Sequence, residues 1–125
     1  VIGAGAAGLV SAYIAAAEAP ARSRLAHFRD RALEIAPTAE EGTSYGMPAL
    51  RYRGRPLIAV ITTKVGYSVY PFSPEVVAAT LPLTPGLKAT KGGVTFTEEK
   101  LLSDEAFDAL ENSRVAEIDA ALGGR

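Results

Sequence analysis

Residues 40–56 read EEGTSYGMPALRYRGRP, and the passage from helix to sheet takes place within this stretch. An acidic pair ends a helical region, and the glycines and prolines that follow favour turns. From Leu50 to Arg53 apolar and basic side chains alternate, which places them on opposite faces of an extended chain. The stretch therefore predicts a hairpin that follows a helix.

The sequence before this stretch predicts two helices. Residues 9–18 are rich in alanine, which has the highest helix propensity, and Pro20 interrupts the pattern. Residues 21–36 carry apolar side chains at helical spacing, namely Leu25, Phe28, Ala32, Ile35 and Ala36. Pro37 ends the second helix, because the residue before a proline avoids the helical conformation.

The sequence after the stretch predicts strands and two more helices. Residues 57–63 begin with a continuous apolar run that is typical of a strand buried on both faces. Alternating residues 65–70 predict a third strand, and residues 94–97 predict a last one. Serines 73 and 103 precede acidic first turns, which is typical of helix starts. Helices that flank hairpin-linked strands predict an α+β fold with a mostly antiparallel sheet.

Length and composition restrict the class of protein. A chain of 125 residues predicts one domain over residues 1–125, with residues 1–8 as a flexible or helix-leading N-terminal segment. No cysteine is present, which excludes disulfides and thiolate sites and fits a reducing, cytoplasmic compartment. Thirteen basic and fourteen acidic residues nearly cancel, so charge does not favour nucleic acid. The longest apolar run, residues 57–61, is too short to span a membrane.

The N-terminal run VIGAGAAGL has the glycine spacing of a dinucleotide-binding fingerprint, at Gly3, Gly5 and Gly8. Such a site needs a strand before the glycines and a second strand that ends in an acidic residue about 20 positions on. Only two residues precede the glycines, and Asp30 lies in a segment with helical periodicity. We expect no cofactor-binding residue in this run. A flavin or nicotinamide enzyme therefore ranks third, behind the two functions considered below.

Catalysis has little support in the sequence. The chain has one histidine, no cysteine and no serine in a nucleophile-elbow context. The sequence pattern indicates no pair of residues that could act as nucleophile and base. We therefore expect no catalytic residue and a protein that is not an enzyme.

Carboxylates suggest two candidate metal sites. His27, Asp30 and Glu34 share a helical face, on which neighbouring pairs are close enough to hold one ion. Glu34, with Glu40 and Glu41 just beyond the end of that helix, forms an acidic corner. Hard carboxylate ligands suit ferrous or other divalent ions at modest affinity. The alternative is a solvated face that neighbouring arginines neutralise.

Basic residues suggest a candidate anion site. Arg51 and Arg53 project from one strand face, and Lys88 and Lys91 lie on a glycine-bearing loop. Guanidinium groups recognise carboxylate or phosphate through paired hydrogen bonds, and Tyr45 can donate another. The alternative is a sheet face that charge keeps in solution.

The run EGTSYGMP at residues 41–48, followed by Tyr52 and by GRP at residues 54–56, resembles the YdhG-like family (domain of unknown function 1801). Its members are small bacterial proteins described as frataxin-like, and some are described as intracellular iron chaperones. Further matching pieces follow in the family's order at residues 13–14, 66–72, 91–92, 96 and 114–118.

The resemblance implies helices packed on one face of an antiparallel sheet of about four to five strands. It also implies weak ferrous iron binding and delivery of Fe²⁺ to iron–sulphur or haem assembly proteins. Frataxin-type proteins bind iron along an acidic helix edge that runs into the first strand. The matching residues here are Asp30, Glu34, Glu40 and Glu41. The alternative function is a non-enzymatic binding module for a small anionic ligand or a partner segment.

Overall fold

The computed structural model describes residues 8–90 and 92–123 of the chain. The helices are α1 (Leu9–Ala16), α2 (Ala21–Ile35), α3 (Pro74–Ala79), the short 3-10 helix η1 (Leu81–Leu83) and α4 (Asp104–Ala121). The strands are β1 (Glu40–Ser44), β2 (Met47–Tyr52), β3 (Arg55–Thr62), β4 (Tyr67–Tyr70), β5 (Lys88–Ala89) and β6 (Val94–Phe96). None of the described helices is long and apolar enough to cross a membrane.

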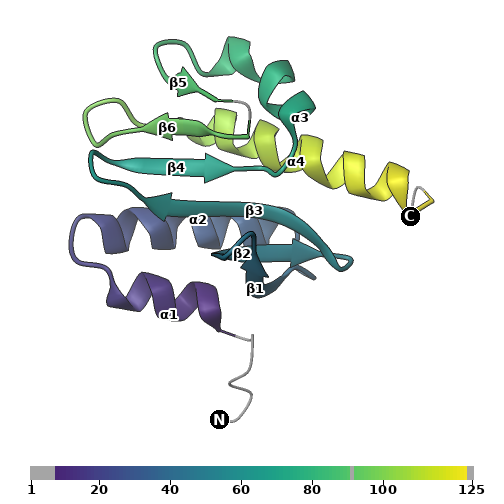
Figure 1. Cartoon of the computed structure of the whole chain (residues 1–125), viewed down its shortest axis with the longest axis horizontal. Helices are drawn as coiled ribbons and strands as arrows, with labels where there is room; N and C mark the ends of the chain where they lie inside the picture. The colour runs from purple at the N-terminus through teal and green to yellow at the C-terminus, as the bar shows by residue number, and fades with distance from the viewer. Residues whose placement is uncertain (1–7, 91, 124–125) are drawn as a thin grey trace.

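The six strands form one antiparallel sheet in the order β1-β2-β3-β4-β6-β5. Helices α2 and α4 lie side by side against one face of it, and α1 lies beside the β1–β2 end (Figure 1). The predicted α+β fold with helices on an antiparallel sheet is confirmed. The sheet has six strands instead of four to five, because β1 and β5 were not predicted. The segment EEGTS of β1 contains residues that are depleted in strands, and β5 has only two residues.

The core lies between the helical layer and the sheet. The predicted stripe of the second helix is buried at Leu25, Phe28 and Ala32. The ring centroid of Phe28 lies 4.8 Å from that of Phe107 on α4 and 5.7 Å from that of Phe96 on β6. These ring contacts join both helices to the sheet. Burial of a side chain of this size stabilises the fold by about 1.5–3 kcal/mol.

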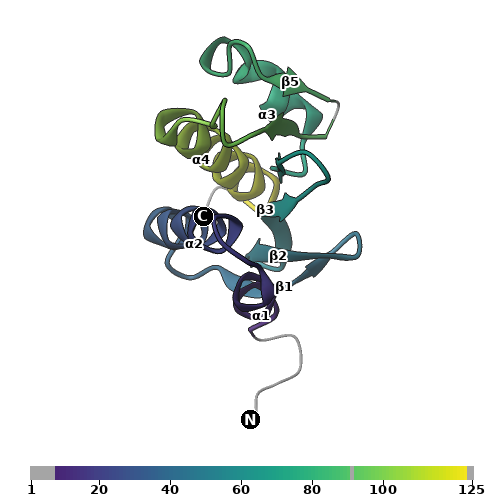
Figure 2. The same ribbon diagram turned by 90° about the vertical axis from the view of Figure 1, so that its left-hand side faces the viewer.

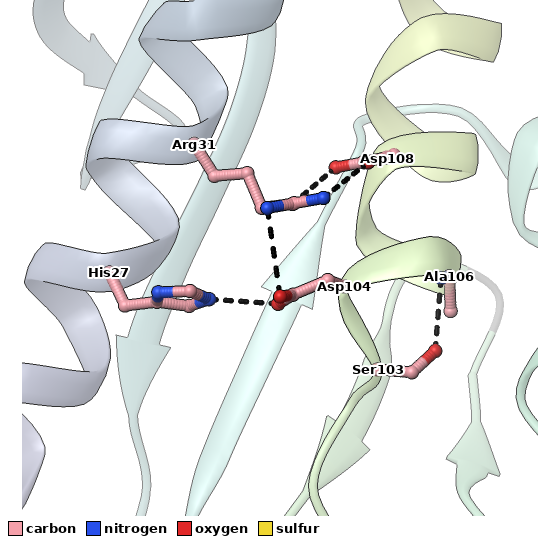
Figure 3. Close-up of polar contacts among 6 residues, drawn as sticks. All are labelled: His27, Arg31, Ser103, Asp104, Ala106 and Asp108. Atoms are coloured by element: carbon pink, nitrogen blue, oxygen red, sulfur yellow. Dashed lines mark hydrogen bonds and ion pairs between the residues drawn. The ribbon is translucent and has the colours of Figure 1, made fainter.

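Ion pairs fasten α2 to α4 at the surface of this layer (Figure 3). His27 Nε2 lies 2.8 Å from Asp104 Oδ1, and Arg31 makes a two-pronged contact with Asp108 at 2.7 and 2.8 Å. Ser103 caps α4 by accepting a hydrogen bond from the backbone N–H of Ala106, as the sequence predicted. The histidine of the predicted helical face is thus engaged with the neighbouring helix.

One carboxyl group lies inside the helical layer. Glu111 of α4 is fully buried, and neither carboxyl oxygen has a hydrogen-bond partner among the described residues. Burial, and secondly the charge of Asp108, raise the pKa of Glu111 to about 8. The folded protein therefore favours the protonated form of this side chain.

Two-residue turns shape the first two hairpins. Tyr45-Gly46 joins β1 to β2, and Arg53-Gly54 joins β2 to β3; all four residues have φ between 53° and 79°. Turns with two positive φ values match the twist of antiparallel strands and favour glycine at the second position. Glycine and proline within residues 54–56 favour a turn, and the structure places that turn at Arg53-Gly54. Pro48, which also favours a turn, is instead part of β2 and pairs with Thr43.

Candidate functional site

The predicted metal residues lie in or near the passage from α2 to β1, but the structure gives them separate partners. The carboxylate of Glu41 accepts hydrogen bonds from the backbone N–H and the hydroxyl of Ser11, both at 2.7 Å, and so caps α1. Asp30 pairs with the adjacent Arg29 at 2.9 Å. Glu34 and Glu40 are exposed. Within residues 8–90 and 92–123, no three His, Asp or Glu side chains are placed to hold one metal ion.

The predicted anion residues are also separated. The guanidinium of Arg51 donates to Ser44 Oγ at 2.8 Å and to the carbonyl oxygens of Thr43 and Gly54 at 3.1 and 2.6 Å. Its side chain lies across β1, where a Cβ added at Gly42 would come within 3.1 Å of it. Arg51 therefore holds the first two hairpins together.

Arg53 points to the helical layer. Its Nη1 lies 2.8 Å from Asp119 Oδ1 on α4, and the Tyr52 hydroxyl donates to the same oxygen at 2.9 Å. These bonds, that of Arg53 first, lower the pKa of Asp119. Arg51 and Arg53 do not share one face, because Arg53 has φ 53° in a turn and leaves the strand alternation. Lys88 lies on β5, at the opposite edge of the sheet, and Lys91 lies outside the described residues.

An aromatic pair joins two distant segments of the chain. Tyr45, at the tip of the β1–β2 hairpin, stacks on Phe72 between β4 and α3, with ring centroids 5.6 Å apart and 19° between the ring planes. Tyr45 is 83% exposed, but its ring is held in place by the stacking contact with Phe72. The two residues have φ values of 53° and 60°. Bulky side chains rarely adopt this conformation, which costs about 1–3 kcal/mol and is concentrated at functional sites.

The pair borders a hollow of about 300 Å³ that we call the aromatic groove. Its lining consists of Tyr45, Met47, Tyr70, Phe72, Ser73, Pro74 and Gly92. Val69 points into the core, so the next residue, Tyr70, points to the sheet face away from α2 and α4. Figure 2 shows the β1–β2 hairpin projecting on the side of the sheet away from these helices. The groove therefore lies on the face that α2 and α4 leave open.

Gly93 determines how the Tyr70 ring lies. A Cβ added at Gly93 would come within 2.6 Å of Tyr70 Cδ1 and 2.5 Å of the Val69 carbonyl oxygen. Real Cβ atoms do not approach so closely, so the ring rests on glycine backbone. The floor of the groove depends on this absence of a side chain.

A polar hollow of about 250 Å³ adjoins the groove and shares Phe72, Ser73 and Pro74 with it. The Ser73 hydroxyl accepts from the Val76 N–H at 3.2 Å and donates to Glu117 at 2.7 Å. Glu117 also pairs with Arg114 at 2.9 Å. The exposed Arg55 and Glu75 complete the charged lining. An apolar groove beside fixed polar groups is suited to binding.

Sequence reasoning named Tyr45 as a candidate but not Met47, Tyr70 or Phe72. A signal was present, because the matching pieces at residues 41–48 and 66–72 both contribute to the groove. Their convergence depends on the strand order of the sheet, in which β1 and β4 lie on either side of β2 and β3. The described residues that line the groove supply tyrosine and serine hydroxyls but no histidine, cysteine or carboxylate that could serve as a base.

No protein-family model and no curated protein matches the chain in sequence. Among solved structures, the crystal structure of YdhG from Bacillus subtilis, described as a protein of the DUF1801 family, superposes with a TM-score of 0.77. The match covers 92% of this chain and 94% of that one, at 14% sequence identity. The chain has the fold of a DUF1801 protein. At this identity the likeness concerns the DUF1801 fold alone.

Proposed function

We propose that the protein is a non-enzymatic binding module that holds an extended segment of a partner protein in the aromatic groove. The observation that carries this proposal is the stacked pair Tyr45–Phe72, which two strained backbone positions hold at the surface. Strain of this kind persists only where the surrounding structure enforces it. Tyr45 is 83% exposed and Phe72 is half-buried, so a bound partner would cover the stacked pair further.

The surroundings of the pair favour a peptide over a small anion. Tyrosine and phenylalanine supply large, rigid contact area, and tyrosine is enriched among the residues that dominate binding energy. The adjoining polar hollow supplies Arg55, Glu75 and the Ser73–Glu117 pair as a rim. An apolar side chain of the partner would enter the groove, and its backbone would meet the polar rim.

The test is a selection from a displayed library of random peptides against the wild-type protein. We expect enrichment of sequences with an aromatic or large apolar residue, and loss of that enrichment with Tyr45→Ala. Leu81→Ala, which removes an exposed apolar side chain outside the groove, is the matched control and should select the same sequences. Absence of enriched sequences, or enrichment that survives Tyr45→Ala, would contradict the proposal.

Weak ferrous iron binding for delivery to iron–sulphur or haem assembly proteins is a second proposal. It rests on the resemblance of residues 41–56 to the YdhG-like family. In its favour, Glu34 and Glu40 are exposed near the end of α2, where a hydrated ion has access. Against a tight site, Glu41 caps α1 and Asp30 pairs with Arg29. Any site here would therefore have few protein ligands and low affinity.

Anaerobic titration with Fe²⁺ tests this second proposal. Glu34→Gln with Glu40→Gln should weaken binding, whereas Glu105→Gln, which removes an exposed carboxylate on α4, should leave it unchanged. Equal binding by all three proteins, or none by the wild type, would rule out a site at this corner.

A further inference from the structure

A hollow of about 460 Å³ lies at the other end of the sheet, between the β3–β4 turn, the segment before β5 and the end of β6. We call it the lysine hollow. It is lined by Thr63, Val65, Tyr67, Gly86, Leu87, Lys88, Thr90, Thr95, Phe96, Thr97 and Lys100. None of its described lining residues also lines the aromatic groove.

The floor and one edge of the lysine hollow are apolar. Tyr67 and Phe96 are buried and stack with ring centroids 5.1 Å apart. Leu87 is half-buried, and Val65 is 81% exposed at the tip of the β3–β4 turn. An apolar group of a ligand would cover Leu87 and Val65. Removing this apolar surface from water would favour binding.

The rim carries two positive charges, those of Lys88 and Lys100. Neither Lys88 nor Lys100 forms an ion pair with any residue in the described ranges. The ammonium of Lys100 lies above Gly86, 3.9 Å from the position of an added Cβ. Among the described residues, the lining contains no Asp or Glu. Glu98 is occupied by Arg24 and the Tyr67 hydroxyl, and Glu99 lines a different hollow.

Two threonine hydroxyls in the lysine hollow have a proton to donate. Thr63 Oγ1 accepts from the Gly66 N–H at 3.0 Å, and Thr97 Oγ1 accepts from the Lys100 N–H at 3.0 Å. A hydroxyl has one proton, and neither of these protons is used in a hydrogen bond to another described residue. Each hydroxyl can therefore donate to a ligand oxygen.

We infer that the lysine hollow binds a small amphipathic anion, with a carboxylate or phosphate head on the two lysines and a short apolar tail on the apolar edge. The charge-assisted contacts come from Lys88 and Lys100, and hydroxyl donors complete the head-group site. This site is separate from the aromatic groove, and its failure would leave the proposed peptide binding intact.

The experiment is a titration of the ¹⁵N-labelled protein with hexyl phosphate, followed by amide chemical shifts. We expect shifts at the amides of residues 63–67, 87–88 and 95–100 and none at Tyr45. Inorganic phosphate should bind about tenfold more weakly, and hexyltrimethylammonium should produce no shifts at these amides. Lys88→Gln and Lys100→Gln should each weaken hexyl phosphate binding about tenfold. Arg22→Gln, which removes the same charge from α2 and lies outside both hollows and the groove, should not.

Several outcomes would overturn this inference. One is that hexyl phosphate produces no shifts at these amides. Another is that hexyltrimethylammonium or inorganic phosphate binds as tightly as hexyl phosphate. A third is that the lysine variants bind hexyl phosphate as tightly as the wild type does. Binding to vesicles of phosphatidylglycerol without binding of monomeric hexyl phosphate would also overturn it, in favour of a membrane surface. Far-UV circular dichroism of each variant, compared with the wild type, verifies that the fold is retained.

Discussion

Replacement of Glu111 should remove a large pH dependence from the stability of the protein. The carboxyl is fully buried without a hydrogen-bond partner, and its pKa is raised from 4.5 to about 8 in the folded state. Because the folded pKa is higher, the protonated form is favoured by folding. The contribution of Glu111 to the free energy of unfolding is fully present below pH 4.5 and is lost as the pH rises to about 8. The loss relative to acid pH is about 3 kcal/mol at pH 7.

Urea unfolding followed by circular dichroism at pH 5, 7 and 8.5 measures this effect. The free energy of unfolding of the wild type should fall by several kcal/mol from pH 5 to pH 8.5 relative to Glu111→Gln. Glu111→Met, which also removes the buried polar group, should gain about 3 kcal/mol at pH 7 over the wild type. Comparing the wild type with Glu111→Gln cancels the pH dependence that arises from groups titrating in both proteins. An identical pH slope for the wild type and Glu111→Gln would refute the reasoning.

Three further substitutions test other parts of the structure. Gly93→Ala should destabilise the protein by about 1–3 kcal/mol, because its Cβ would clash with the Tyr70 ring, and a thermal melt with an unchanged midpoint would contradict this. Asp104→Asn should cost about 0.5 kcal/mol at pH 7, since the ion pairs are half exposed. Its contacts, that with His27 first, lower the pKa of Asp104, so this difference in urea stability should shrink as the pH falls below 4. Glu41→Ala removes the cap of α1, and hydrogen exchange should show faster amides in α1 with those of α4 unchanged.

Local signals in the sequence predicted the elements they determine. Serine caps at residues 73 and 103 and the apolar stripe of α2 are read from neighbouring residues, and the structure confirms them. The strand β1 was missed because Glu40, Glu41 and Gly42 have low strand propensity. Pairing with β2 and the contact of Glu41 with Ser11 hold this segment extended. These contacts are not local, so no nearby residue indicates them.

The candidate site was less predictable for the same reason. Alternation placed Arg51 and Arg53 on one face, but a positive φ at Arg53 directs its side chain to Asp119. Tyr45 and Phe72 meet only because the strand order brings the two segments together, and no local pattern indicates the positive φ of Phe72. Sequence reasoning also overlooked Glu111, since glutamate is rarely fully buried.

The affinity of one selected peptide for matched variants tests the aromatic groove most directly. The dissociation constant of the tightest-binding library peptide is measured by isothermal titration calorimetry for the wild type, Tyr45→Ala, Phe72→Ala and Leu81→Ala. If the stacked pair is the binding site, each aromatic substitution weakens binding by about 30-fold or more, and Leu81→Ala changes it by less than about twofold. Unchanged affinity for Tyr45→Ala and Phe72→Ala would contradict the assignment of the groove as the functional site.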